Sequence, residues 1–196
     1  MERRPLAVAI TGGIAAGKSE ALASFARHGS AVASSDEVVH RVYAQDETLK
    51  AELRARWGDD VFGSDGEVDR AAIGRIVFAD RGELDWLEQQ VHPRVRAVNR
   101  AWLEELAARH EPPALAVVEV PLLYETGAEA GFDRVVAITA PAELRERRRV
   151  GVDDRAARLV PDDEKVRRAD FAFVNDGTLA ELDAFVGSVV ERLTSS

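Results

Sequence analysis

One short segment, Gly12-Gly13-Ile14-Ala15-Ala16-Gly17-Lys18-Ser19, constrains the fold of this chain more than any other part of the sequence. It satisfies the pattern G-x-x-x-x-G-K-[ST] and lies between an apolar run at 6–10 and a helical pattern at 18–28. The order of strand, glycine loop and helix predicts the first unit of an α/β fold. The alternative is a helix cap that happens to carry glycines, which the fixed positions of the pattern disfavour.

A loop of this kind turns its backbone N–H groups towards one point at a helix N-terminus, where they favour an anion. We expect Lys18 to reach the β and γ phosphates of a nucleotide and the Ser19 hydroxyl to bind Mg²⁺. Of the 26 Lys and Arg residues in the chain, only Lys18, Lys50 and Lys165 are Lys. A Lys in the loop is therefore informative.

The rest of the chain alternates between strand and helix patterns. Short apolar runs recur at 31–33, 114–120, 135–139 and 171–174, and helical patterns lie between most of them. Continuous apolar runs are typical of strands buried on both faces. The sequence therefore predicts an α/β fold with a mainly parallel five-stranded sheet covered by helices on both sides.

The segment 47–110 departs from this alternation, because it consists almost entirely of helical patterns. Breaks are expected at Gly58, at 64–66 and at His92-Pro93. We therefore expect a helical insertion at 47–110 within a core domain formed by 1–46 and 111–196.

Two carboxylates follow predicted strands. Residues at the carboxyl ends of parallel strands face the ligand crevice, so Asp36 is a candidate to accept the proton of an attacking hydroxyl. Its alternative role is a plain N-cap of the following helix. Glu119 is a candidate to orient Mg²⁺ waters or bind substrate, with a structural ion pair as the alternative.

A cationic segment follows the fourth strand. Arginine suits the binding of phosphate oxygens, and phosphoryl transfer needs cations around the moving group. The alternative is that this segment is only a solvated helix face. If some of its arginines face inward and bind phosphate, we expect Arg155 first and Arg148 second. Six arginines lie in this segment: Arg145, Arg147, Arg148, Arg149, Arg155 and Arg158.

The composition excludes several other classes of protein. The absence of Cys excludes disulfides, thiolate catalysis and cysteine metal sites. A formal net charge of −9 opposes non-specific binding to nucleic acid or anionic membranes, so neither partner is expected. No apolar run approaches the roughly 18 residues of a membrane span, and the N-terminus leads into a strand, so we expect a cytoplasmic protein.

Several separated motifs together resemble the dephospho-coenzyme A kinase family over nearly the whole chain. They are the phosphate loop with its Thr11-Gly12-Gly13-Ile14 start, Ser35-Asp36, the segment 65–70 followed by 76–78, His92-Pro93, Val120-Pro121-Leu122-Leu123-Tyr124-Glu125, and Glu164-Lys165 through Ala169-Asp170 to Asn175-Asp176-Gly177. The resemblance implies phosphorylation of the ribose 3′-hydroxyl of dephospho-coenzyme A by ATP with Mg²⁺. It also implies a three-layer P-loop kinase fold, a helical substrate-binding domain and an Arg-rich lid at about 145–160.

The resemblance also suggests roles for individual residues. Lys18 and Ser19 match the phosphate and Mg²⁺ positions, Asp36 the carboxylate that takes the hydroxyl proton, and Arg155 the lid arginine. The expected catalytic set is Asp36, Lys18, Arg155 and Arg148. The expected ATP site is Gly12, Gly13, Ile14, Ala15, Ala16, Gly17, Lys18, Ser19, Glu20 and Arg155. The expected substrate site is Asp36, His92, Pro93, Glu119 and Leu122.

The chain departs from the family pattern at four places. Ala15 stands where the family usually has Gly, so its methyl group demands either a negative φ or strain. Glu20 replaces the usual Thr and needs only its backbone N–H to serve a phosphate. Ser34 replaces the first acid of a D-x-D pattern, and the lid between Arg149 and Arg155 is several residues short.

Two alternatives to this function stay open at this stage. One is another P-loop small-molecule kinase, such as a nucleoside kinase, and the other is a non-catalytic nucleotide-binding protein. ATP and dephospho-coenzyme A are the expected partners of a monomer.

Overall fold

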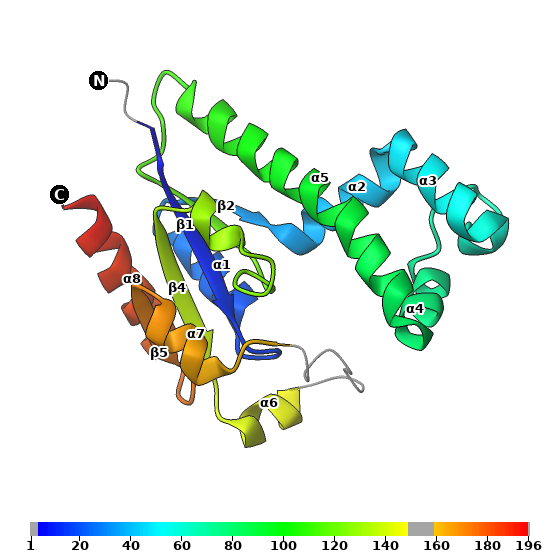
Figure 1. Ribbon diagram of the computed structural model, residues 1–196. Helices are drawn as coiled ribbons and strands as arrows, with labels where there is room; N and C mark the ends of the chain where they lie inside the picture. The colour runs from blue at the N-terminus through cyan, green and yellow to red at the C-terminus, as the bar shows by residue number, and fades with distance from the viewer. Residues whose placement is uncertain (1–3, 149–158, 196) are drawn as a thin grey trace. The chain divides into compact units, whose positions relative to one another are not determined.

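The computed structural model describes residues 4–148 and 159–195, and the chain divides into two compact units (Figure 1). We call Met1–Ser35 with Ala101–Ser196 the sheet unit and Asp36–Arg100 the helical unit. The helix α5 (Arg81–Ala107) contributes residues to both. Within the described residues, no helix is both long and apolar enough to span a lipid bilayer.

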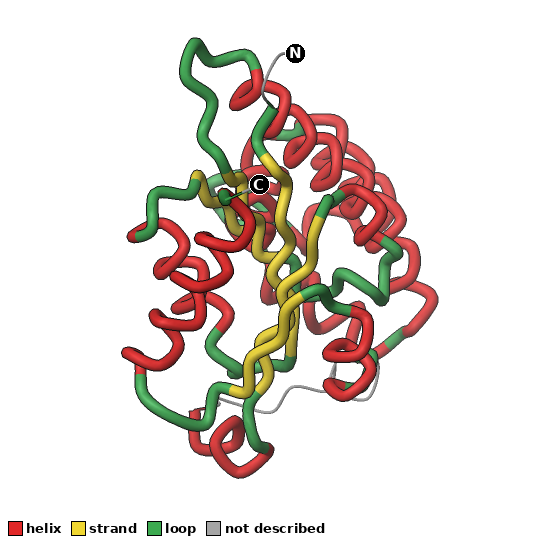
Figure 2. The backbone as a smooth tube through the Cα atoms, turned by 90° about the vertical axis from the view of Figure 1, so that its left-hand side faces the viewer, coloured by secondary structure: helices red, strands yellow, loops and turns green. Residues whose placement is uncertain are grey.

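The sheet unit contains five parallel strands in the order β2-β3-β1-β4-β5. The strands are yellow in Figure 2. They are β1 (Leu6–Gly12), β2 (Ala31–Ser34), β3 (Leu115–Glu119), β4 (Arg134–Thr139) and β5 (Phe171–Val174). The predicted five-stranded sheet is confirmed. Because β1 is the central strand, the loop that follows it lies at the middle of the carboxyl end of the sheet.

Both faces of this sheet are covered, which gives three layers. Val8 and Ile10 of β1 share one core with Phe25 of α1 (Lys18–Arg27) and Val186 of α8 (Leu179–Thr194). Ala9 points to the opposite face and packs with residues of the turn that follows β3 and of β4. The remaining elements of the unit are η2 (Ala128–Gly131), α6 (Ala142–Arg148) and α7 (Asp162–Arg168).

The strand register places the last residues of three neighbouring strands together, at the carboxyl end of the sheet. Glu119, the last residue of β3, is the register partner of both Ile10 in β1 and Ser34 in β2. Gly12 is the partner of Ile138 in β4. The carboxyl ends of parallel strands form the ligand crevice of such sheets, so this register places the start of the phosphate loop, Ser34 and Glu119 there.

The helical unit has its own apolar core. Its elements are α2 (Ser35–Gln45, from Asp36 onward), α3 (Glu47–Trp57), η1 (Gly58–Val61), α4 (Arg70–Ala79) and the first part of α5. The side chains of Asp46 and Asp69 accept backbone N–H groups at the starts of α3 and α4. Leu49, Leu53 and Val61 are completely buried in this core.

Two details of this unit differ from the sequence predictions. The break expected at His92-Pro93 is wrong, because Pro93 lies inside the continuous α5. A proline removes one helical hydrogen bond and crowds the carbonyl four residues earlier, but packing can retain the helix. Along the chain, the boundaries between the units fall at Ser35/Asp36 and Arg100/Ala101, rather than at 46/47 and 110/111. The first boundary lies earlier than predicted because Val38 and Val42 of α2 belong to the helical core.

Candidate active site

The loop between β1 and α1 has a backbone that only glycine fits at two positions. Gly12 has a φ of 145°, and a Cβ atom there would overlap the carbonyl oxygen of Ile138. Gly17 has a φ of 98°, and a Cβ atom would overlap the side-chain amide of Asn175. These glycines therefore fix the close approach of the loop to β4 and to the residue that follows β5.

Ala15 decides a question that the sequence left open. Its φ is 57°, in the left-handed region, and it is the non-glycine residue with a positive φ in the described part of the chain. Of the two possibilities for a methyl group at this position, strain is therefore the one that occurs. An alanine in this region costs about 1–2 kcal/mol.

The two chemically reactive side chains of the loop point to different partners. The Nζ atom of Lys18 donates to the carbonyl oxygen of Gly13 at 2.9 Å, so the ammonium lies across the first turn of the loop. The Ser19 hydroxyl donates to Oε2 of Glu119 at 3.3 Å. The side chain of Glu20 pairs with Arg27 at 3.1 Å, so its carboxylate is engaged along α1.

Ser19 and Glu119 suit a magnesium ion. Both side chains offer oxygen atoms as metal ligands, and Glu119 is 6% exposed at the end of β3, beside the loop. Mg²⁺ in nucleotide sites is usually held by one or two protein oxygens together with water and phosphate. The described residues contain no cluster of three or more His, Asp or Glu side chains that could hold a metal ion.

Asn175 is a buried residue of the loop region that the sequence reasoning did not select. Its Nδ2 atom donates to the carbonyl oxygen of Ala16 at 2.8 Å, and its backbone N–H donates to Thr139 at 2.7 Å. It therefore fixes the phosphate loop to the end of β4. The sequence could have indicated this residue, because Asn175-Asp176-Gly177 is one of the motifs of the family resemblance. No role was assigned to Asn175 on that basis.

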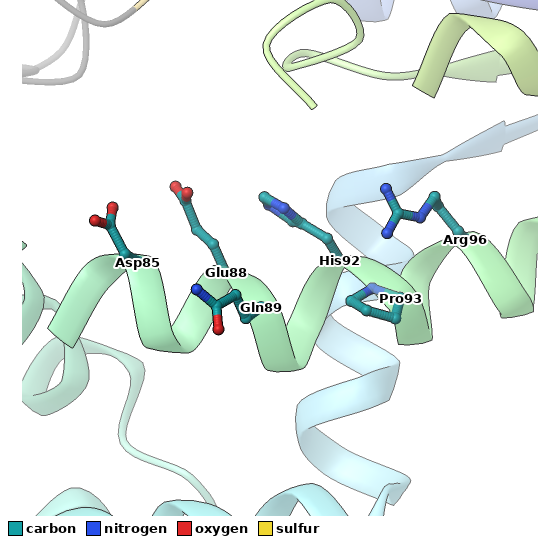
Figure 3. A pocket seen from close by; sticks show the side chains of 6 residues that line it. All are labelled: Asp85, Glu88, Gln89, His92, Pro93 and Arg96. Atoms are coloured by element: carbon teal, nitrogen blue, oxygen red, sulfur yellow. The ribbon is translucent and has the colours of Figure 1, made fainter. Parts of the chain in front are cut away.

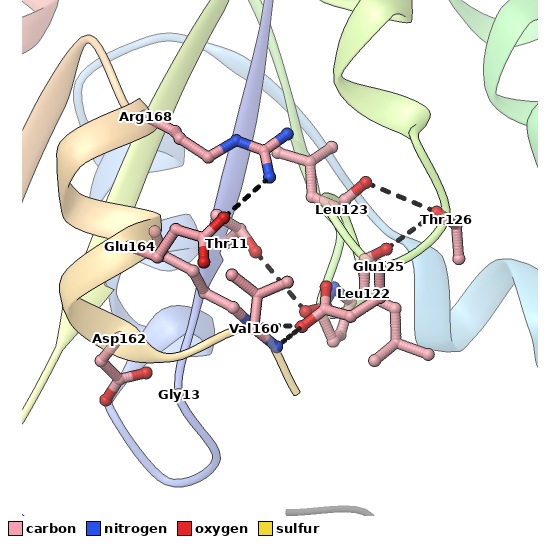
Figure 4. A network of polar contacts seen from close by, with 12 residues as sticks. Thr11, Gly13, Leu122, Leu123, Glu125, Thr126, Val160, Asp162, Glu164 and Arg168 are labelled. Atoms are coloured by element: carbon pink, nitrogen blue, oxygen red, sulfur yellow. Dashed lines mark hydrogen bonds and ion pairs between the residues drawn. The ribbon is translucent and has the colours of Figure 1, made fainter. Parts of the chain in front are cut away.

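The turn after β3 connects the loop region to α7 (Figure 4). Thr11 donates to the carbonyl oxygen of Pro121 at 3.4 Å, and Thr126 donates to that of Leu122 at 2.8 Å. Glu125 accepts the backbone N–H of Val160 at 2.9 Å and lies 2.8 Å from the ammonium of the completely buried Lys165. Leu122 lies half-buried in this turn, and its expected role in substrate binding stays a prediction.

Of the predicted cationic segment, the structure describes the part that forms α6. Arg148 is exposed at the end of this helix, whereas Arg145 lies 3.3 Å from the carboxylate of Asp162 in α7. Arg149, Arg155 and Arg158 fall outside the described residues. The roles expected for Arg155 and Arg148 therefore stay predictions.

Asp36 is the first residue of the helical unit and is exposed in the first turn of α2. Because α2 begins at Ser35, Asp36 does not occupy the N-cap position that was the alternative to its catalytic role. A carboxylate in a first turn still interacts favourably with the helix dipole. Its use as the base for a hydroxyl group stays a prediction.

His92 and Pro93 line a hollow of about 410 Å³ along α5. Asp85, Glu88, His92 and Arg96 project from one side of this helix (Figure 3). Burial lowers the pKa of His92 below its usual value of 6.5, and the neighbouring Glu88 opposes this shift. The shift favours the neutral imidazole, which can donate one hydrogen bond and accept one.

Comparison with known proteins identifies the family of the chain. The family model for dephospho-CoA kinase matches residues 6–181. A curated dephospho-CoA kinase from Anaeromyxobacter dehalogenans is 40% identical over 178 residues, which cover 87% of this chain and 83% of that protein. The chain belongs to the dephospho-CoA kinase family.

Solved structures have the same fold as this chain. A crystal structure from Thermus thermophilus has a TM-score of 0.79 and 34% identity, and covers 98% of this chain and 100% of its own. The dephospho-CoA kinase from Campylobacter jejuni has a TM-score of 0.73 at 23% identity, covering 96% and 97% of the two chains, and supports the fold alone. The expected three-layer P-loop kinase fold is therefore confirmed.

Proposed function

We propose that this protein transfers the γ-phosphoryl group of ATP to the ribose 3′-hydroxyl of dephospho-CoA, which produces CoA. The observation that carries this proposal is a phosphate loop with Lys18 and Ser19, the latter beside Glu119, in a chain that belongs to the dephospho-CoA kinase family. Transfer of this kind depends mainly on positioning and on charge neutralisation.

The loop and its neighbours would bind the nucleotide. The backbone N–H groups of Gly12 to Glu20 would hold the phosphates, and Lys18 would exchange the carbonyl of Gly13 for phosphate oxygens, because a phosphate is the stronger acceptor. Ser19 would hold Mg²⁺ and Glu119 would orient its waters. When bound, Mg²⁺ neutralises charge on the phosphate oxygens. Arg155 and Arg148 are the arginines predicted to close over the phosphates.

The acceptor would be bound mainly by residues outside the phosphate loop. Asp36 would orient or deprotonate the 3′-hydroxyl, and His92, Pro93, Glu119 and Leu122 would contact the substrate. In this view the sheet unit is the nucleotide-binding part and the helical unit is the part that binds the CoA side. A monomeric state and a cytoplasmic location are the accompanying predictions.

The test is ADP release by the purified protein with a panel of acceptors. Dephospho-CoA should support turnover with formation of CoA, whereas CoA itself, which already carries the 3′-phosphate, should not. Nucleosides and shikimate serve as the other acceptors. Turnover with a nucleoside but not with dephospho-CoA, or ATP binding without transfer to any acceptor, would overturn the proposal.

The role of Asp36 is tested by Asp36→Asn, with Glu37→Gln as the matched control in the same helical turn. Both residues are exposed, so stability should change little in either variant. Asp36→Asn should lower kcat about 10²-fold, within the range of general base catalysis, and leave ATP affinity unchanged. Equal kcat values in the two variants would remove Asp36 from the mechanism.

A further inference from the structure

An ion pair between α6 and α7 lies directly against the phosphate loop. Nη1 of Arg145 is 3.3 Å from Oδ2 of Asp162. A Cβ atom at Gly13 would lie 2.8 Å from that Nη1 and 2.9 Å from that oxygen, so the pair occupies the space that a side chain at position 13 would need. Figure 4 shows Asp162 beside Gly13 at the start of α7.

The charges make this arrangement significant. A carboxylate next to a loop that binds polyphosphate repels the ligand unless a cation neutralises it. Arg145 supplies that cation, and Gly13 is also the residue whose carbonyl accepts the Lys18 ammonium. Two cations therefore meet at this glycine.

Arg145 also has hydrogen-bonding capacity to spare. A guanidinium has five N–H donors in a planar fork. Its Nε atom is buried and has no hydrogen-bond partner among the residues that the structure describes. Its side chain as a whole is 32% exposed, so part of it is accessible to a ligand on the loop.

Building on the proposed function, we propose that Arg145 is a phosphate-binding arginine of the nucleotide site and that Asp162 is a positioning residue that holds it against Gly13. The ion pair orients the guanidinium before the nucleotide binds, and the remaining donors then bind phosphate oxygens. This assignment adds to the roles predicted for Arg155 and Arg148.

The decisive measurement is the Kd for ATP, determined by calorimetry without an acceptor. Arg145→Gln should weaken ATP binding about 10- to 100-fold, the effect of losing a charge-assisted hydrogen bond. Arg147→Gln removes the same charge from an exposed position on the same helix and should change the Kd less than about threefold, the weaker effect of an exposed, screened charge. Because no acceptor is present, the result does not depend on the identity of the phosphorylated substrate.

The double variant tests whether the charge of Asp162 acts on the ligand when Arg145 no longer neutralises it. In Arg145→Gln the carboxylate of Asp162 is left uncompensated beside the loop, so adding Asp162→Asn should recover about 3- to 10-fold in affinity. Asp163→Asn is the control, since Asp163 pairs with the exposed Arg167 on the same helix and should give no recovery.

Three outcomes would overturn the proposal. They are a Kd for Arg145→Gln within twofold of the wild type, whether or not the melting temperature falls, equal effects of Arg145→Gln and Arg147→Gln on the Kd, and no recovery of affinity when Asp162→Asn is added to Arg145→Gln. If Arg145→Gln does not fold, Arg145→Lys keeps the charge but loses the planar fork, and it should weaken ATP binding severalfold. Failure of dephospho-CoA as an acceptor, with ATP binding intact in the wild type, would instead count against the proposed function.

Discussion

The strain at Ala15 leads to a prediction of stability that can be worked out from the backbone. Replacing Ala15 by Gly removes the left-handed penalty of about 1–2 kcal/mol at a φ of 57°. Glycine also makes the unfolded chain more flexible, which costs about 0.4–1 kcal/mol. The first effect is the larger, so Ala15→Gly should raise the free energy of unfolding by about 0.5–1 kcal/mol.

Ala16 is a matched control one residue away. It is completely buried in the core of the sheet unit and has no positive φ. Ala16→Gly should lose a methyl burial of about 0.8 kcal/mol and a further 0.5–1 kcal/mol of backbone entropy. The two variants should therefore differ by about 2 kcal/mol in stability, with opposite signs relative to the wild type.

Thermal melting measures this difference. For a chain of this length, 1 kcal/mol corresponds to about 2–4 °C, so Tm should differ by about 4–8 °C between the variants. The melts are done without nucleotide, because bound ligand would stabilise each variant by a different amount. A lower Tm for Ala15→Gly than for the wild type would show that Ala15 is not strained.

Three further changes have expected outcomes. Lys18→Ala should leave a folded protein and lower kcat about 10²-fold or more, measured by ADP release, because its ammonium acts on transition-state charge. Asn175→Ala leaves the buried carbonyl of Ala16 without its donor, so Tm should fall by an amount that corresponds to about 1–3 kcal/mol and the Kd for ATP should rise, whereas the exposed Asp176→Ala should change neither. The hydrogen bond from Ser24 and the pairing with Arg27 lower the pKa of Asp183 from 3.8 to about 2. The ionised carboxylate therefore stabilises the fold above pH 4, and this contribution is lost as the pH falls towards 2. Asp183→Asn should flatten the dependence of Tm on pH in that window.

The sheet could be predicted because each strand is a continuous apolar run. The run 114–118, before Glu119, has no polar face, and only a position between two helical layers buries it fully. The continuity of α5 through Pro93 could not be read in the same way. A proline marks a break on local grounds, and the opposing contribution comes from packing of residues such as Val91 and Val95, which depends on the whole helical core.

The polar site was predictable where residues lie at strand ends. Lys18 and Ser19 follow from the loop pattern, and Glu119 was a candidate because it ends a strand; its contact with Ser19 depends on the pairing of β3 with β1, which only the structure shows. Asn175 was missed because it serves the loop from the end of an edge strand. Asn after a strand usually indicates a turn, and only the fold shows that its amide reaches Ala16.

The pairing of Arg145 with Asp162 depends on the rotation of α7 about its axis, which the sequence alone leaves undetermined. Asp162 is three residues before Lys165, so the two share a helix face. Lys165 is completely buried against Glu125, and this burial turns Asp162 inward, whereas Asp163 points to solvent and pairs with Arg167. A lysine is normally exposed, so the sequence favours the opposite rotation, in which this face of α7 is solvated. The buried Lys165 therefore determines which of these neighbouring acids faces the phosphate loop.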